Sequence, residues 1–219
     1  MKNNEFILHE QIRGDCYRLL SACFYSPQKK LFVQENLLEN LTTSLEKVCP
    51  EAAPFSLKMK DSLTKYSDED LSVEYAKLFV GPFELKAPPY GSVYLDKEKR
   101  VMGDSTMEVI KAYQEQGLSI DDEFKELPDH ISAELEFMYY LVHREVEALK
   151  EGDKKRALKW IEPQEAFLST FLKPWVPHFC EKIKEGTDNQ FYKSLADCVS
   201  TFIDHFHGYR KAALNFLAA

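Results

Sequence analysis

The spacing of apolar residues constrains the fold of this chain more than any other feature. On both sides of one irregular stretch, residues 81–104, apolar side chains recur at intervals of three and four residues. That period is typical of α-helices packed on one face, and no period-two alternation is sustained that would indicate strands. Hydrophobic residues make up 44% of the 219, enough for one sizeable core. The sequence therefore predicts an all-α fold, a single globular helical domain of about eight to ten helices.

Capping residues and helix breakers divide the periodic segments into individual helices. Ser67 with Asp70, and Ser105 with Glu108, have the spacing of a capping box at a helix start. Gly117 is placed to end the helix that Ser105 begins. The expected helices span about residues 6–25, 30–48, 54–65, 67–80, 105–116, 129–150, 153–171, 174–184 and 189–216.

Residues 81–104 form the one long segment without a helical pattern. They contain three of the eight glycines and three of the ten prolines, together with Phe83, Tyr90 and Tyr94. Aromatic side chains seek burial, so we expect a long ordered loop packed on helices rather than a disordered one. Gly91 and Gly103 permit tight turns or the close approach of another group, and the SVYL sequence between them suggests a short extended piece.

The segment from 129 to 150 has the widest apolar arc, which is typical of a central helix. His130 and Glu134 lie on this arc one turn apart, near Phe137, whereas the helical period places Asp129 on the opposite, polar side. Burying a carboxylate requires a donor or protonation. Two interpretations stay open: Asp129 caps the helix while His130 and Glu134 form a satisfied core pair, or these groups belong to a functional site.

Charge and cysteine content exclude several classes of protein. A formal charge of −8 disfavours nucleic acid as a partner and favours a basic one. The five cysteines are an odd number without a C-x-x-C pair, so we expect buried thiols in a reducing compartment rather than disulfides or a zinc or iron–sulfur site. No signal peptide and no apolar run of about 20 residues is evident. The sequence predicts a cytoplasmic protein without a membrane span.

Catalytic signatures are weak throughout the chain. No H-E-x-x-H, G-x-G-x-x-G or Walker sequence occurs, and Gly103-Asp104-Ser105 lacks the second glycine of a nucleophile elbow because Met107 stands there. A hydrolase using Asp129 with His130, or His130 with Glu134, as acid and base would need a nucleophile or metal that the sequence does not supply. No enzyme activity, metal or cofactor is therefore expected.

Five segments carry a resemblance to a known family. They are YAKLFVGPF (75–83), PPYGSVYLDKEKRVMGDST (88–106), LPDHISAELEFM (127–138), QEAFLSTFLKPWVPHFCEKI (164–183) and FYKSLADCVSTF (191–202). In this order they resemble the TorD and DmsD family of twin-arginine leader-binding chaperones for molybdoenzymes, which is related to the NarJ type. The resemblance covers about residues 71–202. The chain departs from the DmsD branch in having Phe83, Tyr90 and Tyr94 where tryptophan often occurs.

The resemblance implies a cytoplasmic chaperone without catalytic activity. Such proteins bind the twin-arginine signal peptide, and often the body, of the catalytic subunit of a molybdopterin oxidoreductase. They delay export of this subunit until the cofactor is inserted, and they make transient contact with the export machinery. A structural subunit or adaptor of a redox complex is the alternative. By the family's motif, Asp129, His130, Gly103 and the loop aromatics carry over as leader-binding positions.

A twin-arginine leader needs carboxylates for its guanidinium groups and apolar surface for the segment that follows. Asp129, Asp96 and Glu84 are the candidate carboxylates. The full set of candidate peptide-binding residues is Phe83, Tyr90, Gly91, Ser92, Tyr94, Gly103, Asp129, His130, Glu134 and Phe137. A hinge near 126–131 between two helical halves would allow a monomer to form domain-swapped dimers.

Overall fold

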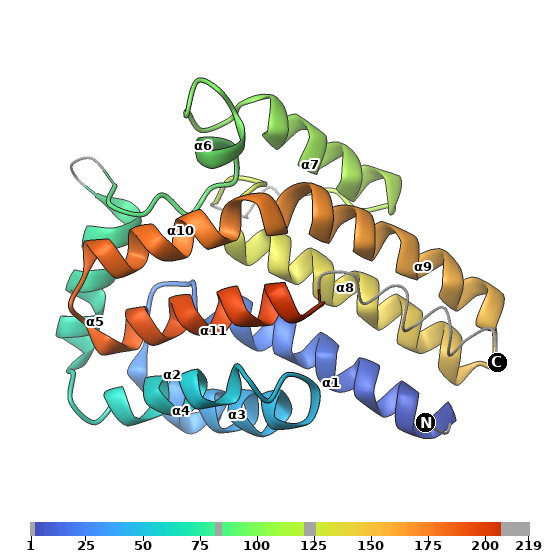
Figure 1. The fold of residues 1–219 in the computed structure, drawn as a ribbon, viewed down its shortest axis with the longest axis horizontal. Coiled ribbons are helices and arrows are strands. Elements are labelled where there is room, and N and C mark those ends of the chain that lie inside the picture. Colours follow the sequence, from blue (N-terminus) through green and yellow to red (C-terminus); the bar gives the residue numbers. More distant parts are fainter. Residues whose placement is uncertain (1–2, 82–84, 121–125, 207–219) are drawn as a thin grey trace.

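The computed structural model describes residues 3–81, 85–120 and 126–206 of the chain (Figure 1). In chain order the elements are α1 (Asn3–Ala22), α2 (Lys29–Gln34), α3 (Leu37–Val48), α4 (Ala53–Ser62), α5 (Asp68–Tyr75), η1 (Ala76–Val80), α6 (Ser92–Leu95), α7 (Asp104–Glu115), α8 (Ile131–Lys150), α9 (Lys154–Phe167), η2 (Leu168–Leu172), α10 (Lys173–Gly186) and α11 (Gln190–Phe206). The described residues contain no strand, only an isolated bridge between Tyr90 and His130. The all-α prediction is confirmed.

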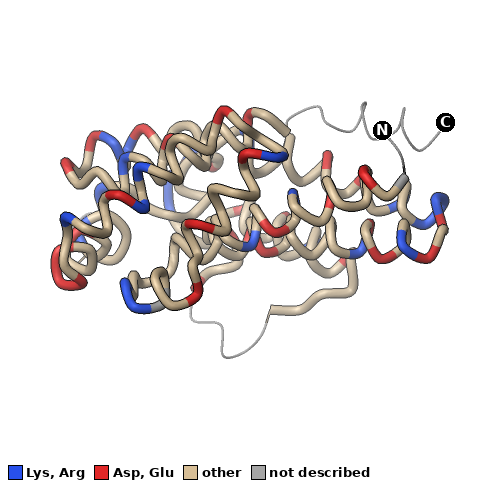
Figure 2. Tube along the Cα trace, turned by 90° about the horizontal axis from the view of Figure 1, so that it is seen from below, with Lys and Arg blue, Asp and Glu red and all other residues tan. Residues whose placement is uncertain are grey.

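The helices pack in layers around α8 and α11. In Figure 1, α1, α8 and α9 run side by side, while α11 lies between α10 and the group formed by α2, α3 and α4. The short α6 and the longer α7 project from this body above α8 and α10. Lys/Arg and Asp/Glu are interspersed along the elements in Figure 2. Within the described part of the chain, no helix combines the length and apolarity that crossing a membrane requires.

Local signals predicted several helix ends correctly. At the start of α5, the Ser67 hydroxyl accepts from the Asp70 N–H at 3.1 Å, and the Asp70 carboxylate accepts from the Ser67 N–H at 2.9 Å. The predicted capping box is therefore present. After α7, Gly117 adopts the left-handed conformation (φ 77°) that ends many helices. The predicted helix from 189 is α11, and residues 207–216 of that prediction lie outside the described residues.

Two predictions about where helices are continuous are wrong. The single helix expected over 30–48 is divided into α2 and α3 by Asn36, whose φ of 48° reverses the backbone. Conversely, the break expected between 171 and 174 is absent, because α9, η2 and α10 follow one another from Lys154 to Gly186. The π-helical segment η2 accommodates this by a bond from the Lys173 N–H to the Leu168 carbonyl, immediately before Pro174.

One continuous cluster of buried apolar side chains fills the space between the helices, from Cys16 on α1 to Phe206 on α11. All five cysteines are buried and unpaired, as the sequence predicts. Burial raises the pKa of Cys23 to about 12 and that of Cys49 to about 11, which keeps both thiols protonated at neutral pH.

A buried polar network joins α1 to α8 and α9 outside this apolar cluster. The Arg13 guanidinium donates to Glu10 Oε2 at 2.9 Å and to Gln164 Oε1 at 2.6 Å. The Gln164 amide donates in turn to Glu145 Oε2 at 2.8 Å. Arg13, Glu10 and Glu145 are almost wholly buried, so water screens their charges poorly. The Arg13 guanidinium lies against both carboxylates, and His9 Nδ1 lies 2.9 Å from Glu10 Oε1.

Candidate functional site

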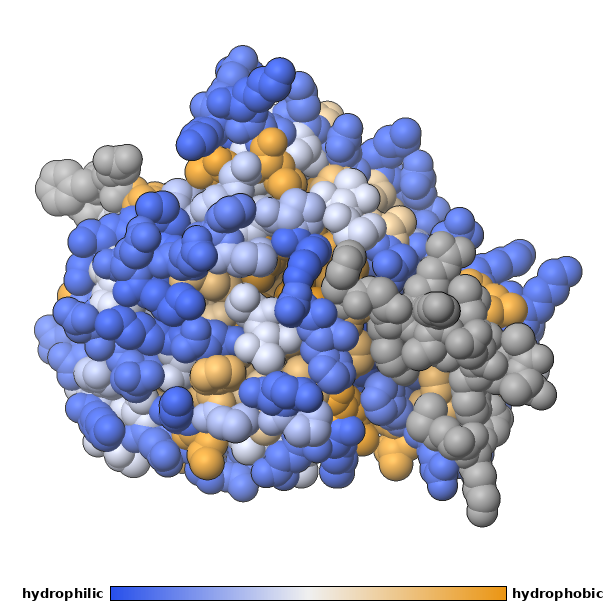
Figure 3. All heavy atoms as spheres, in the orientation of Figure 1, coloured by the Kyte–Doolittle hydropathy of each residue, from blue (hydrophilic) through white to orange (hydrophobic). Residues whose placement is uncertain are grey.

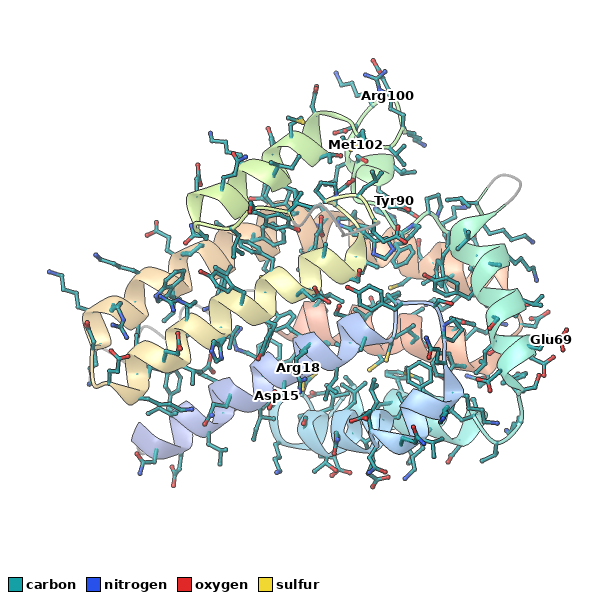
Figure 4. All side chains as sticks on the ribbon, turned by 180° about the vertical axis from the view of Figure 1, so that it is seen from behind. Asp15, Arg18, Glu69, Tyr90, Arg100 and Met102 are labelled. Atoms are coloured by element: carbon teal, nitrogen blue, oxygen red, sulfur yellow. The ribbon has the colours of Figure 1, made fainter. Side chains whose placement is uncertain are left out.

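The loop before α7 and the segment before α8, where the sequence predicts a hinge, are held together by their backbones. The Gly91 N–H donates to the Asp129 carbonyl, and the Ile131 N–H donates to the Pro89 carbonyl, both at 2.9 Å. We call residues 89–92 and 129–131 the loop–hinge joint. Figure 4 shows Tyr90 beside the start of α8, below the tip that carries Arg100 and Met102. Two segments that the sequence marked separately therefore meet at one place.

Asp129 faces the interior at this joint. Its side chain is 1% exposed. Its Oδ2 accepts a hydrogen bond of 2.8 Å from the backbone N–H of Ser92, which is the first residue of α6. The predictions that Asp129 points to the polar side and caps α8 are wrong. The backbone of His130 is extended (ψ 139°), so the helical period does not reach back to residue 129. The SVYL sequence is likewise a helical turn, not an extended piece, and a carboxylate at its N-terminus favours that turn.

His130, rather than Asp129, is the residue that caps α8. Its Nδ1 accepts from the Ser132 N–H at 3.2 Å and lies 2.7 Å from the Ser132 hydroxyl. Burial lowers the pKa of His130 to about 4, because a charged imidazolium is poorly solvated there. The imidazole is therefore neutral near pH 7.

The Glu134 carboxyl group forms a hydrogen bond with a residue of another helix. Its Oε2 accepts from the Trp175 indole N–H of α10 at 3.0 Å, so it and His130 use different partners instead of forming the expected core pair. Burial raises the pKa of Glu134 well above its ordinary value; the Trp175 hydrogen bond opposes this shift, and the nearby charge of Asp129 adds to it. The carboxyl group is 0% exposed.

Gly91 fits into this arrangement because it has no side chain. A Cβ atom there would lie 3.1 Å from Trp175 Nε1 and 3.2 Å from Glu134 Oε1, tighter than ordinary contacts. Tyr94, one helical turn on, stacks on Trp175 with ring centroids 5.5 Å apart. The close approach predicted for Gly91 is thus an approach to the protein's own Glu134–Trp175 pair.

Several buried polar atoms in the joint or next to it have no hydrogen-bond partner among the described residues. They are Asp129 Oδ1, Glu134 Oε1, Ser92 Oγ and the Tyr94 hydroxyl. Leaving such atoms unpaired in the interior has a free-energy cost of about 1–3 kcal/mol each. These atoms can form further hydrogen bonds, with the Ser92 and Tyr94 hydroxyls as donors or acceptors and the two carboxyl oxygens as acceptors.

Asp96 and Gly103 form a separate turn at the start of α7. The Ser105 hydroxyl donates to Asp96 Oδ2 at 3.1 Å, and a Cβ on Gly103 would lie 1.9 Å from the same oxygen. The predicted Ser105–Glu108 capping box is wrong, because the Asp96 carboxylate accepts from the Ser105 N–H at 3.3 Å instead. A side chain at 103 would therefore have to displace the Asp96 carboxylate from the start of α7.

The remaining predicted residues divide between surface and core. Tyr90 is half-buried, and its hydroxyl donates to Glu126 Oε2 at 3.0 Å. Phe137 is buried, with its ring centroid 4.6 Å from that of Tyr113 and 4.7 Å from that of Phe167. Phe83 and Glu84 lie outside the described residues.

Two grooves flank the joint. The first, which we call the hinge groove, has a volume of about 300 Å³ and a mainly apolar lining that includes Tyr113, Leu118, Ile120, Pro128, Phe137 and Tyr140, with Glu136 beside them. The second has a volume of about 1040 Å³ and lies between the loop and α10, where Val93 and Tyr94 face charged residues such as Glu181. Figure 3 shows apolar surface gathered below the hydrophilic tip near α6.

Sequence reasoning missed three residues of this region: Trp175, Glu126 and Glu136. Glu126 directly precedes the Leu127-Pro128 hinge, so its position beside a marked motif was an available signal. Glu136 is exposed one turn into α8, next to Phe137. Trp175 is 41 positions from Glu134, and no local pattern indicates that contact.

The titration of Glu134 gives a testable prediction. Its folded-state pKa is raised, so above about pH 4.5 the folded chain holds a proton that the unfolded chain has lost. Stability from this group is complete below that pH and falls as pH rises through the folded pKa. Glu134→Gln removes the effect while keeping an oxygen for Trp175. In urea unfolding at pH 5, 7 and 8, we expect the variant to gain stability relative to the parent as pH rises.

His130 makes stability depend on pH in the opposite direction, but this does not obscure the comparison between variant and parent. Its lowered pKa adds stability above about pH 6.5 that is lost as pH falls towards 4, and both proteins share it. A difference between variant and parent that stays constant from pH 5 to 8 would contradict the assigned shift of Glu134.

Comparison with known proteins identifies the family. The chain matches the model described as "Nitrate reductase delta subunit" over residues 35–181, a span that includes the whole joint. It is 28% identical over 190 residues to the Tat proofreading chaperone DmsD of Salmonella typhi, covering 81% of this chain and 80% of that protein. It is 25% identical over 209 residues to the chaperone protein TorD of Aliivibrio salmonicida, covering 92% and 95%.

A solved structure supports the fold. The crystal structure of a candidate redox enzyme maturation protein from Archaeoglobus fulgidus aligns with a TM-score of 0.56 at 24% identity, covering 87% of this chain and 93% of that one. The resemblance predicted from the motifs is confirmed. Since the family model matches well over half of its residues, the chain belongs to the nitrate reductase delta subunit family, to which its TorD and DmsD relatives also point.

Proposed function

We propose that this protein is a cytoplasmic, non-catalytic chaperone that binds the twin-arginine signal peptide of a molybdenum-cofactor oxidoreductase. It would delay export of that client until the cofactor is inserted and folding is complete. The observation that carries the proposal is the similarity to Tat proofreading chaperones over about four fifths of both chains. The apolar hinge groove and the carboxylates near it add physical support.

The arrangement of the joint suggests how a leader would be recognised. The apolar segment of the leader would occupy the hinge groove, beside Pro128 and Phe137. The Glu126 and Glu136 carboxylates are accessible, unlike those of Asp129 and Glu134, and would accept hydrogen bonds from guanidinium groups. Tyr90, bonded to Glu126, offers an aromatic face for stacking.

The buried predicted residues take a different role in this proposal. Gly91, Ser92, Asp129, His130 and Glu134 would hold the loop against the hinge and so define the shape of the groove. Their unpaired polar atoms would make the joint responsive to a bound peptide. Tyr94 would act through its stacking on Trp175.

A second candidate function follows from the family's description as a subunit. The chain would then be a permanent structural component of a redox complex, with its helical faces covered by other subunits. The two functions differ in how long the chain stays bound to its partner. A constitutive equimolar complex that remains after the enzyme has matured would favour the subunit.

Isothermal titration with leader peptides from the host's molybdoenzymes tests the chaperone proposal. We expect one client leader to bind at about micromolar Kd, as is common for transient contacts of this size. The matched peptide with both arginines replaced by lysine should bind at least about tenfold more weakly, because lysine cannot form bidentate pairs with carboxylates. Absence of binding by every leader, or equal binding of the lysine peptide, would overturn the proposal.

A further inference from the structure

Three side chains that can ligate a metal converge far from the loop–hinge joint. Cys49 ends α3, Glu51 lies in the turn before α4, and His205 is in the last turn of α11. One ligand atom of each lies within 4.8 Å of the other two. Packing of α11 on α4 brings His205 to this turn, about 150 positions along the chain from Cys49.

Their chemistry and spacing suit a divalent metal ion of the zinc type. Zinc binds thiolate, imidazole and carboxylate at about 2.0–2.3 Å in a tetrahedron, so its ligand atoms lie roughly 3.3–3.8 Å apart. His205 Nδ1 and Glu51 Oε2 are 3.4 Å apart, which already fits this spacing. The Cys49 sulfur lies within 4.8 Å of the other two ligand atoms, so a shift of about 1 Å brings it into the same range.

Burial also suits a site with one open position. Cys49 is fully buried and closes the inner side, whereas the side chains of Glu51 and His205 are 66% and 36% exposed. An ion could therefore enter from solvent and keep a water molecule as its fourth ligand. Three protein ligands with one open position is a common zinc arrangement.

We propose that Cys49, Glu51 and His205 bind one Zn²⁺ or similar ion. On binding, the Cys49 thiol releases its proton to solvent, and its sulfur coordinates the ion together with His205 Nδ1 and a Glu51 oxygen; no electron is transferred. The ion links the α3–α4 turn to the end of α11. This site is separate from the leader site and does not depend on the proposed function.

Cobalt is the probe, because a Co²⁺–thiolate bond gives an absorption band in the near ultraviolet. Titration of the metal-free full chain should produce this band at one equivalent, and Zn²⁺ should displace it. His205→Asn should weaken zinc binding at least about tenfold in competition with a chelating dye. The control is His178→Asn, since His178 is an exposed histidine 3.9 Å from Glu181 and should leave affinity unchanged.

Cys49→Ser should abolish the band, but its site is buried, so folding must be checked by circular dichroism. Glu51→Gln and His205→Asn are exposed and decide the question if Cys49→Ser does not fold. The proposal would be overturned by the absence of a thiolate band in the parent protein. It would also be overturned if His205→Asn and Glu51→Gln both bound zinc as tightly as the parent.

Discussion

Arg13→Ala is expected to lower the free energy of unfolding by about 3–5 kcal/mol, the usual consequence of removing one partner from a buried ion pair. The Arg13 guanidinium is 3% exposed and compensates the buried carboxylates of Glu10 and Glu145. Burial and the neighbouring Glu10 raise the pKa of Glu145, whereas Arg13 lowers it. Without Arg13 both buried carboxylates lose a charged donor, which destabilises the fold even though the Gln164 amide still donates to Glu145 and His9 Nδ1 still lies 2.9 Å from Glu10 Oε1.

Urea unfolding followed by circular dichroism measures this loss. The matched control is Arg18→Ala, further along α1, where Arg18 and Asp15 form an exposed pair 3.7 Å apart (Figure 4). Exposed pairs of this kind contribute about 0–1 kcal/mol, so little change is expected there. Similar losses for the two variants would contradict the stabilising role assigned to the buried network.

Trp175→Ala is expected to be comparably severe, with a loss of about 3–5 kcal/mol. Trp175 is fully buried, stacks on Tyr94 and donates to Glu134. Its removal would leave a large cavity and deprive a buried carboxyl group of its donor. We therefore also expect leader affinity to fall, since the loop would lose its support against the hinge.

Trp175→Phe separates packing from hydrogen bonding. It keeps an aromatic ring against Tyr94 but removes the indole N–H, at an expected cost of about 1–3 kcal/mol. Thermal unfolding and leader titration on both variants provide the measurements. Parent-like stability and leader affinity in Trp175→Phe would show that the Glu134–Trp175 bond does not shape the site.

Much of the fold was predictable because its signals are local. Ser67 and Asp70 are three residues apart and bond to each other, and Gly117 ends α7 through its own backbone conformation. The break at Asn36 and the continuity through Leu168–Leu172 were not predictable in this way. An asparagine does not have to adopt a positive φ, and a π-helical turn depends on packing around it rather than on a motif.

The candidate site was predictable as a region but not in its geometry. The motifs marked the loop and the segment before α8, which lie together in the structure, yet the helical period misplaced Asp129 because that residue precedes the helix. Glu134 was recognised as needing a donor, but Trp175 became its partner only through the packing of α10 on the joint. Contacts between residues far apart in the sequence do not affect the local spacing of residue types, so only the folded chain shows them.

Photo-cross-linking tests most directly whether the loop–hinge joint is where a leader binds. A client leader with a photoreactive residue beside its twin arginines would be irradiated with the full chain, and the linked peptides identified by mass spectrometry. We expect links to residues 88–95, 113–120 and 126–140, around the joint and the hinge groove. Links confined to a distant surface, such as that of α3, would contradict it.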